Sequence, residues 1–156
     1  MEKIYYNNPL LKRSSELRKD ENFLKSILDS EDVNFIPMRD DENYFISGKE
    51  EIKPLILKRH ELELYTKDIN LDKMIFLGKI NEKFYFSINL KSKIDKNNLE
   101  IDQGDIITDQ LRNVIGSLTE LDSSYLALAK GMTFWHEKNK FCGVCGSKTK
   151  MEEAGF

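Results

Sequence analysis

Apolar residues recur at helical spacing over residues 14–29, which predicts a short helix capped by Ser14 or Ser15. The pattern then changes to short β-prone runs that are separated by charged residues. Three such runs cover residues 33–38, 44–47 and 52–58. The charged residues 40–42 are suited to a hairpin turn between the first two runs. Residues 61–65 are expected to extend the same sheet.

A second hairpin is predicted over residues 74–80 and 83–90. In the second of these runs apolar side chains alternate with more polar ones, so one face should be buried and the other half-polar. The face expected to be buried comprises Phe84, Phe86 and Ile88. The face expected to be half-polar comprises Tyr85, Ser87 and Asn89. Residues 91–104 are predicted to form a polar linker.

The longest helix is predicted over residues 118–139, with Thr119 as its N-cap and acidic residues in its first turn. At ~1.5 Å per residue this helix would be ~30 Å long. Gly131 weakens a helix, which indicates close packing against a neighbouring element. Residues 106–118 are predicted to form a shorter helix with a break near Gly116. The apolar stripe expected to face the core comprises Leu121, Tyr125, Leu128, Met132 and Trp135.

The composition supports a packed core beside a well-solvated surface, since 40% of the 156 residues are hydrophobic and 33% are charged. A mixed sheet with a few helices belongs to the α+β class. The formal charge of −3 argues against a dedicated nucleic-acid binder, which usually carries a clear basic excess. A local basic patch is compatible with this charge.

The N-terminal residues lack the apolar core of a signal peptide, and no apolar run approaches the ~18 residues of a membrane span. Two cysteines cannot form a disulfide framework for a chain of this length. We therefore expect a soluble cytoplasmic protein with reduced thiols and no membrane contact.

The candidate chemistry lies at Cys142 and Cys145, within the sequence FCGVCG. A zinc ribbon has two C-x-x-C pairs about 15–20 residues apart, and Gly146 would open the backbone behind the second sulfur. This first interpretation predicts half of a structural Zn²⁺ site. The second pair would be absent because the chain is a shortened form of a longer protein, because two copies pool their cysteines, or because the knuckle is vestigial.

Two other interpretations of Cys142 and Cys145 stay open. A redox dithiol is disfavoured, because the pair follows the end of a long helix, whose partial negative charge disfavours a thiolate. Lys138 and Lys140 partly offset this charge. The remaining interpretation is a pair of buried thiols in a turn.

The last five residues, EEAGF, fit the tail of a Nudix box, a helix whose glutamates hold divalent metal ions. The rest of the box fails, because Lys140 stands at the position of its first glutamate and Phe134 at that of its glycine. Glu152 and Glu153 are therefore interpreted as solvated charges and not as a catalytic pair. No catalytic residue is assigned.

The C-terminal segment resembles the bacterial NADH pyrophosphatases, in which a helix ending in W-H enters a zinc ribbon through F-C-x-x-C-G-x-x-T. The residues that carry the resemblance are Trp135, His136, Phe141, Cys142, Cys145, Gly146 and Thr149, with Gly155-Phe156 at the family's glycine-aromatic position. The tripeptides Asn8-Pro9-Leu10 and Phe76-Leu77-Gly78 are also similar. Leu11 departs from the family, which commonly has an aspartate there.

The resemblance implies a degenerate, non-catalytic Nudix-like domain in residues 1–104, a helical connector in 105–140 and the first half of a zinc ribbon in 141–156. A catalytic Nudix domain that uses Mg²⁺ or Mn²⁺ would follow. The family hydrolyses NAD(H) to nicotinamide mononucleotide and AMP, can remove NAD caps from RNA, and is typically dimeric.

Two functions follow as hypotheses. The first is a scaffolding and dimerisation region of such an enzyme, inactive alone, within a homodimer whose substrates are NAD(H) or NAD-capped RNA. The alternative is a stand-alone zinc-knuckle binding module that dimerises by pooling two cysteine pairs.

Other conspicuous residues have ordinary structural interpretations. His136 is interpreted as a packed or capping histidine, because the ligands of zinc ribbons normally lie in the knuckles. Trp135 is predicted to lie in the core. Lys58, Arg59 and His60 are interpreted as a solvated edge and not as a phosphate site.

Overall fold

One open, mixed sheet of seven strands organises the computed structural model, which describes residues 8–155. The strands are β1 (Leu11–Lys12), β2 (Val33–Arg39), β3 (Glu42–Ser47), β4 (Ile52–Pro54), β5 (Met74–Ile80), β6 (Lys83–Asn89) and β7 (Asp105–Asp109). Their order is β1-β5-β6-β2-β3-β4, and β7 also pairs with β3. Neighbouring strands are antiparallel except β2 and β6, which are parallel. The predicted α+β class is confirmed.

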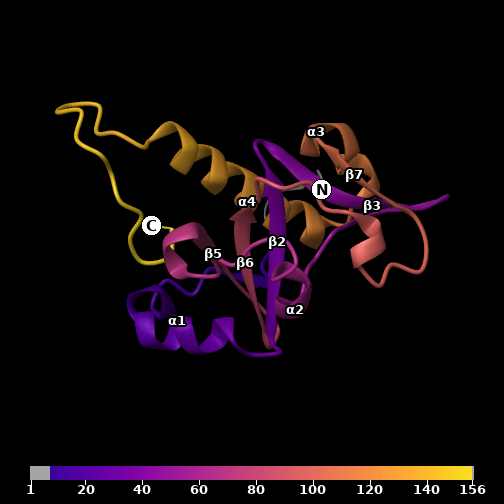
Figure 1. Cartoon of the computed structure of the whole chain (residues 1–156), viewed down its shortest axis with the longest axis horizontal. Helices are drawn as coiled ribbons and strands as arrows, with labels where there is room; N and C mark the ends of the chain where they lie inside the picture. Colours follow the sequence, from indigo (N-terminus) through magenta and orange to yellow (C-terminus); the bar gives the residue numbers. More distant parts are fainter. Residues whose placement is uncertain (1–7, 156) are drawn as a thin grey trace.

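Helices cover both faces of the sheet (Figure 1). They are α1 (Glu21–Leu28), α2 (Arg59–Leu62), α3 (Leu111–Val114) and the long α4 (Glu120–Lys138). Single 3₁₀ turns occupy Leu17–Lys19, Leu71–Lys73, Lys96–Asn98 and Ile115–Ser117. Within the part of the chain that the structure describes, none of these helices combines the length and the apolar character needed to cross a membrane.

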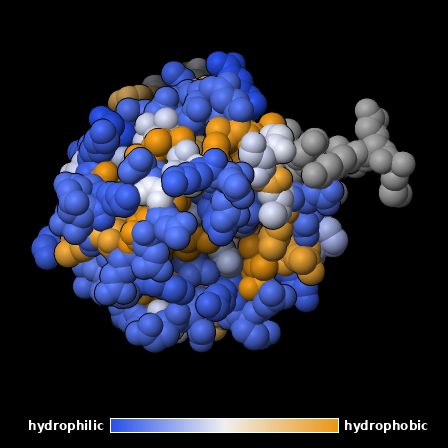
Figure 2. Space-filling model, turned by 90° about the vertical axis from the view of Figure 1, so that its right-hand side faces the viewer, coloured by the Kyte–Doolittle hydropathy of each residue, from blue (hydrophilic) through white to orange (hydrophobic). Residues whose placement is uncertain are grey.

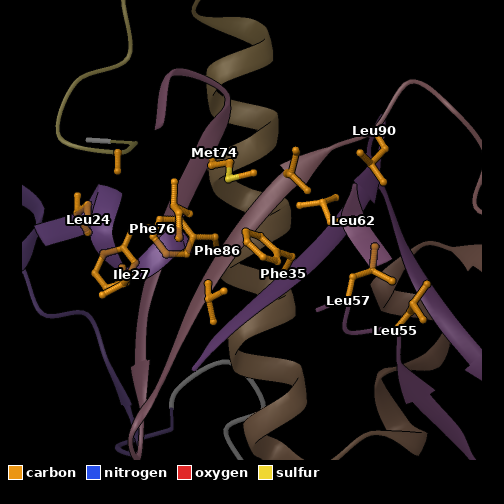
Figure 3. Packing of buried hydrophobic residues seen from close by; sticks show 14 of the residues in the cluster. Leu24, Ile27, Phe35, Leu55, Leu57, Leu62, Met74, Phe76, Phe86 and Leu90 are labelled. Atoms are coloured by element: carbon orange, nitrogen blue, oxygen red, sulfur yellow. The ribbon is translucent and has the colours of Figure 1, made fainter. Parts of the chain in front are cut away.

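The sheet separates two apolar clusters, because successive side chains of a strand point to opposite faces. On β5, Phe76 packs into the cluster that includes α1, whereas Ile75 and Leu77 pack into the cluster that includes α4. Figure 3 shows the first cluster in front of the strands, with α4 behind them. Figure 2 shows the face that lies at the right of Figure 1. This face is mostly hydrophilic, and smaller apolar areas are exposed between the hydrophilic residues.

The first helix is shorter than predicted and has a different cap. It begins at Glu21, and the carboxylate of Asp20 accepts a hydrogen bond from the backbone N–H of Phe23 at 2.9 Å. The predicted caps Ser14 and Ser15 lie outside it, and Ser14 adopts a positive φ of 47°. Aspartate and serine cap the free N–H groups of a first helical turn about equally well. The sequence pattern alone therefore did not distinguish a helix that begins after Ser14 or Ser15 from one that begins after Asp20.

Both predicted hairpins are confirmed. In the first, Met38 pairs with Asn43 and Arg39 with Glu42, which leaves Asp40 and Asp41 as the turn. Asp40 takes a φ of 55°, a conformation that aspartate tolerates better than most residues. In the second hairpin β5 and β6 are antiparallel along their whole lengths.

Two predictions about the strands are wrong. Residues 61–65, expected in the sheet, lie largely in and after helix α2, where the Glu61 carboxylate accepts from the Lys58 N–H at 2.7 Å. Such a capping interaction favours a helical turn over a strand. Residues 106–109, expected to be helical, lie in β7, which pairs with β3 from Asn43 to Ser47. The range 105–140, expected to be a helical connector, therefore begins with a strand.

The half-polar face of β6 is buried under α4. Ser87 is 0% exposed, and its hydroxyl lies 3.3 Å from that of Thr133. The rings of Tyr85 and Tyr125 lie 5.4 Å apart between their centroids. Buried polar groups are tolerated when they are hydrogen-bonded. The pair of hydroxyls therefore allows this face of β6 to be covered without being entirely apolar.

Helix α4 matches its predicted limits and its Thr119 cap. Of the predicted stripe, Tyr125 is buried, and Leu121, Leu128 and Met132 are partly buried against the same apolar cluster. The buried residues of the helix are Ser123, Ser124, Tyr125, Leu126, Ala129 and Thr133. Trp135, predicted to lie in the core, is 52% exposed. Gly131 makes no close contact either, since a Cβ at that position would meet no atom of the described chain within 4 Å. Small and hydroxylated residues face the sheet here, which allows α4 to approach closely.

Candidate metal centre

A tight turn follows the end of α4 and holds both cysteines. Asn139 ends the helix, and its side-chain amide donates to the Trp135 carbonyl oxygen at 2.7 Å. The chain then forms an antiparallel bridge between Phe141 and Lys148. Inside this bridge the Cys142 N–H donates to the Ser147 oxygen at 2.7 Å. The yellow segment of Figure 1 projects from α4 and returns toward β5, which leaves the turn open to solvent.

Gly146 closes the turn as the sequence predicted. Its N–H donates to the Cys142 carbonyl oxygen at 2.9 Å, and its φ is +71°. A side chain is rarely found in this left-handed conformation, which favours glycine. The Thr149 hydroxyl also donates to the Asn139 oxygen, and the Thr149 N–H donates to the Lys140 oxygen at 2.9 Å. These bonds tie the two ends of the turn to the end of α4.

Both cysteines are free thiols; Cys142 is half-buried and Cys145 is exposed. The Cys145 thiol donates a hydrogen bond to the Ser147 hydroxyl across 3.3 Å. When Cys145 is ionised, its sulfur accepts hydrogen bonds from the Ser147 side chain, then from the Ser147 backbone and from Cys142. These bonds favour the thiolate and lower the pKa of Cys145 below that of an ordinary thiol. The buried-thiol interpretation is therefore wrong for Cys145, because its thiol is accessible.

The turn holds two free thiols, and thiolates are common ligands of structural zinc. Structural zinc is almost always held by four ligands in tetrahedral geometry. Among residues 8–155, histidine, cysteine, aspartate and glutamate side chains do not form a group of three or more with the geometry of a metal site. Two thiolates at Cys142 and Cys145 would supply two of the four ligands of such a site.

His136 does not join the two cysteines. It lies in α4 and is half-buried, and its ring packs edge-on against the Trp135 indole, with 5.0 Å between centroids. The last turn of the helix is capped by Asn139. His136 is thus a packed histidine, as predicted, and the capping role falls to another residue.

The residues that fit the tail of a Nudix box do not form a helix. Glu152 and Glu153 are exposed, in agreement with their interpretation as solvated charges. Glu153 and Ala154 have positive φ values of 46° and 50°. The Ala154 oxygen accepts from the N–H of Phe76 at 2.8 Å, so the tail adds to the edge of β5. Phe156 lies outside the described residues.

Arg18 holds this tail in place, a role that the sequence pattern did not predict. The side chain is only 2% exposed and donates to the carbonyl oxygens of Ala154 and Phe76. Its guanidinium also lies 5.2 Å from the centre of the Phe76 ring. Burial, and then the nearby charge of Arg13, lower the pKa of Arg18 to about 10. A single arginine in a charged N-terminal stretch carries no periodic signal that would reveal its burial.

The basic cluster of Lys58, Arg59 and His60 lies at the start of α2, not at a sheet edge. Lys58 Nζ donates to the Asn34 side chain at 2.7 Å. Arg59 pairs with the carboxylates of Asp29 at 3.0 Å and Glu63 at 2.8 Å. Two of these three basic residues, Lys58 and Arg59, therefore have hydrogen-bond or ion-pair partners within the fold.

Comparison with known proteins supports a local relation only. No family model matches the chain. A stretch of 39 residues is 41% identical to the NAD-capped RNA hydrolase NUDT12 of Homo sapiens, and a stretch of equal length and identity matches the protein of that name from Macaca fascicularis. The stretch makes up 25% of this chain and covers 8% of each relative. The local similarity supports a Nudix-like relation.

Proposed function

We propose that this chain is the non-catalytic N-terminal part of an NADH pyrophosphatase that also acts on NAD-capped RNA. Its function is to scaffold and dimerise the enzyme. The observation that carries the proposal is the exposed turn at the end of α4, which holds the free thiols of Cys142 and Cys145. In the proposed enzyme these two residues would supply half of a tetrahedral zinc site. The local similarity to a hydrolase of NAD-capped RNA supports the same assignment.

Four large apolar side chains that are exposed between residues 134 and 144 support the dimerisation role, because removing apolar area from water favours association. They are Phe134 at 51%, Trp135 at 52%, Phe141 at 64% and Val144 at 98% exposure. We propose that a second copy of the chain covers part of this surface, in a cytoplasmic homodimer.

Zinc content separates the leading proposal from a stand-alone zinc-knuckle module. If two copies pool their cysteines, the chain should bind one zinc ion per dimer, and Cys145→Ser should abolish both zinc and dimer. In the leading proposal the dimer is held by apolar surface, so Cys145→Ser should lower zinc content while the dimer persists. Analytical ultracentrifugation and metal analysis, with and without EDTA, measure both quantities.

Val144→Ser is the matched control for that experiment. Val144 lies in the same turn, is 98% exposed and carries no metal donor, so its zinc content should equal that of the wild type. A purely monomeric wild-type chain at every protein concentration would contradict both forms of the proposal.

The chain alone should not hydrolyse NADH. Pyrophosphate hydrolysis by this class needs divalent ions held by convergent carboxylates, and Glu152 and Glu153 are exposed on a non-helical tail. Incubation with NADH and Mn²⁺ should therefore release no nicotinamide mononucleotide by liquid chromatography. A complete NADH pyrophosphatase in the same buffer is the positive control. Robust turnover by the purified chain would contradict the non-catalytic assignment.

A further inference from the structure

The edge of β5 that β1 leaves open is filled by the C-terminal segment. In the described part of the chain, β1 pairs with only the last two residues of β5. Nearer the start of that strand, the Phe76 N–H donates to the Ala154 oxygen at 2.8 Å, and the Phe76 oxygen accepts from the Arg18 side chain. Unpaired backbone groups of an edge strand readily pair with another extended segment. Residues 150–155, here called the strap, therefore occupy a docking site on the sheet.

Small residues let the strap lie against β5. Ala154 is 6% exposed and belongs to the apolar cluster that contains Leu24 and Phe76. Gly155 has a φ of +103°, and a Cβ there would lie 2.7 Å from Cγ2 and 3.3 Å from Cα of Ile75. A side chain is strained in this conformation and has no room beside β5. The docking site therefore selects a segment in which a small residue is followed by glycine.

Docking imposes the conformation of the strap. Glu153 and Ala154 adopt φ values of 46° and 50°, which cost free energy for residues other than glycine. Such conformations persist where the surroundings determine them. Arg18 supplies part of these surroundings, because its buried guanidinium donates to the Ala154 oxygen at 3.3 Å as well as to the Phe76 oxygen. The strap thus holds its shape through contacts with β5 and Arg18 and not through its own backbone preference.

An exposed turn connects the strap to α4 and can act as a hinge. Residues 143–150 are all exposed. Within the described range, the hydrogen bonds of residues 141–149 join the turn to itself and to the end of α4. The strap can therefore leave the sheet while the turn and α4 keep their structure. Figure 1 shows this geometry, in which the yellow segment extends away from α4 before it returns toward β5.

We propose that the strap exchanges between two copies of the chain, so that residues 150–155 of one copy dock on β5 and Arg18 of the other. An exchanged element makes in the partner the same contacts that it makes in its own copy, so exchange is a low-cost route to a dimer. The exchanged form should gain at high protein concentration, since only there does a second strap compete with the tethered one. The inference does not rest on zinc or on the exposed apolar side chains, because its contacts lie on β5, Arg18 and the strap.

A labelled peptide of residues 148–155 tests whether a strap can dock from outside. In the wild-type chain the tethered strap competes with the peptide at an effective concentration that is roughly millimolar. Gly155→Val removes this competitor, because valine clashes with Ile75 and is strained at this φ. The peptide should therefore bind the Gly155→Val chain at least about tenfold more tightly than the wild type, measured by fluorescence anisotropy. A peptide that carries the same Gly155→Val change should not bind, and circular dichroism confirms that each chain is folded.

Arg18→Gln in the Gly155→Val background tests the assigned role of Arg18. The substitution removes the two charge-assisted hydrogen bonds that Arg18 donates at the edge of β5, so the peptide affinity should fall at least about tenfold. Lys19→Gln in the same background is the matched control, because Lys19 loses the same charge in the same 3₁₀ turn but is exposed. Its affinity for the peptide should equal that of the Gly155→Val chain. Equal losses in the two variants would overturn the role of Arg18.

Mixing two defective chains tests exchange between complete copies. The Arg18→Gln chain keeps an intact strap, and the Gly155→Val chain keeps an intact docking site. A mixed dimer has one complete contact and neither parent dimer has any, so native mass spectrometry should detect more mixed dimer than random pairing gives. Mixed dimer at the random level, or equal affinity of the peptide for the wild-type and Gly155→Val chains, would overturn the proposal. EDTA should change neither result, so failure of the zinc proposal and failure of this one are distinguishable.

Discussion

Replacing Phe86 with alanine is expected to lower the free energy of unfolding by about 3–5 kcal/mol. Phe86 is 0% exposed and lies on β6, between β5 and β2 at the middle of the sheet. Its ring centroid lies 5.1 Å from that of Phe76 and 6.3 Å from that of Phe35. Alanine would remove most of the apolar contact and leave a cavity that this tightly connected part of the sheet cannot close. Urea denaturation followed by circular dichroism measures the change.

Leu64→Ala is the control for this substitution, because it truncates a large apolar side chain on the surface and away from the proposed dimer contact. Leu64 is 59% exposed, so its effect on unfolding should stay within about 1 kcal/mol. Similar losses in the two variants would show that the centre of the sheet is not the most tightly packed part of the molecule. A large loss at Phe86 alone would show that the cluster of Phe35, Phe76 and Phe86 is a tightly packed part of the core.

The sequence predicted best where the periodic signal was long and both ends were marked. The two hairpins and the 19-residue α4 follow directly from alternation, charged turns and the Thr119 cap. The sequence-based prediction was wrong for short segments whose secondary structure depends on partners that are distant in the sequence. Residues 105–109 form β7 because β3 offers an open edge, and that edge is not visible in the local sequence.

The orientation of α4 was predicted only in part, because four of the five residues of the predicted stripe pack in or against the cluster on the sheet. A simple apolar stripe placed Trp135 inside, yet the helix buries Ala129 and Thr133 and exposes the indole. A helix packs through small residues when the sheet beneath offers a hydroxyl partner, as Ser87 does for Thr133. That pairing depends on two residues that are far apart in the sequence, so periodicity within one helix does not reveal it.

The cysteine turn could be predicted from the local sequence, unlike β7 and the buried face of α4. The spacing of Cys142, Cys145 and Gly146 was sufficient to predict a glycine-closed turn, because this geometry is local. The argument from the helix dipole was incomplete, since it predicted a disfavoured thiolate. Ser147, which that argument left out, lowers the pKa of Cys145 through its hydroxyl and its N–H.

Replacing Gly78 with alanine is expected to destabilise the chain by roughly 2–4 kcal/mol. Gly78 has a φ of +139° and follows a bulge in β5, where Phe76 pairs with Phe86 but Gly78 pairs with Tyr85. A Cβ at Gly78 would lie 2.3 Å from the Lys12 carbonyl oxygen and 3.0 Å from the Lys12 carbonyl carbon. Both are backbone atoms of β1, so relief of the clash requires β1 to move away from β5. Urea denaturation measures the loss, and hydrogen exchange at Ile80 reports whether the β1–β5 pairing is weakened.

Gly131→Ala is the matched control, because it adds the same methyl group at a glycine with open space. Gly131 lies inside α4, where alanine should stabilise the helix by about 0.5–1 kcal/mol relative to glycine. The two substitutions should therefore change the unfolding free energy in opposite directions. Destabilisation of similar size by Gly131→Ala would mean that α4 packs closely against a neighbour at this position. A neutral Gly78→Ala variant would mean that β1 is held too loosely to resist the added Cβ.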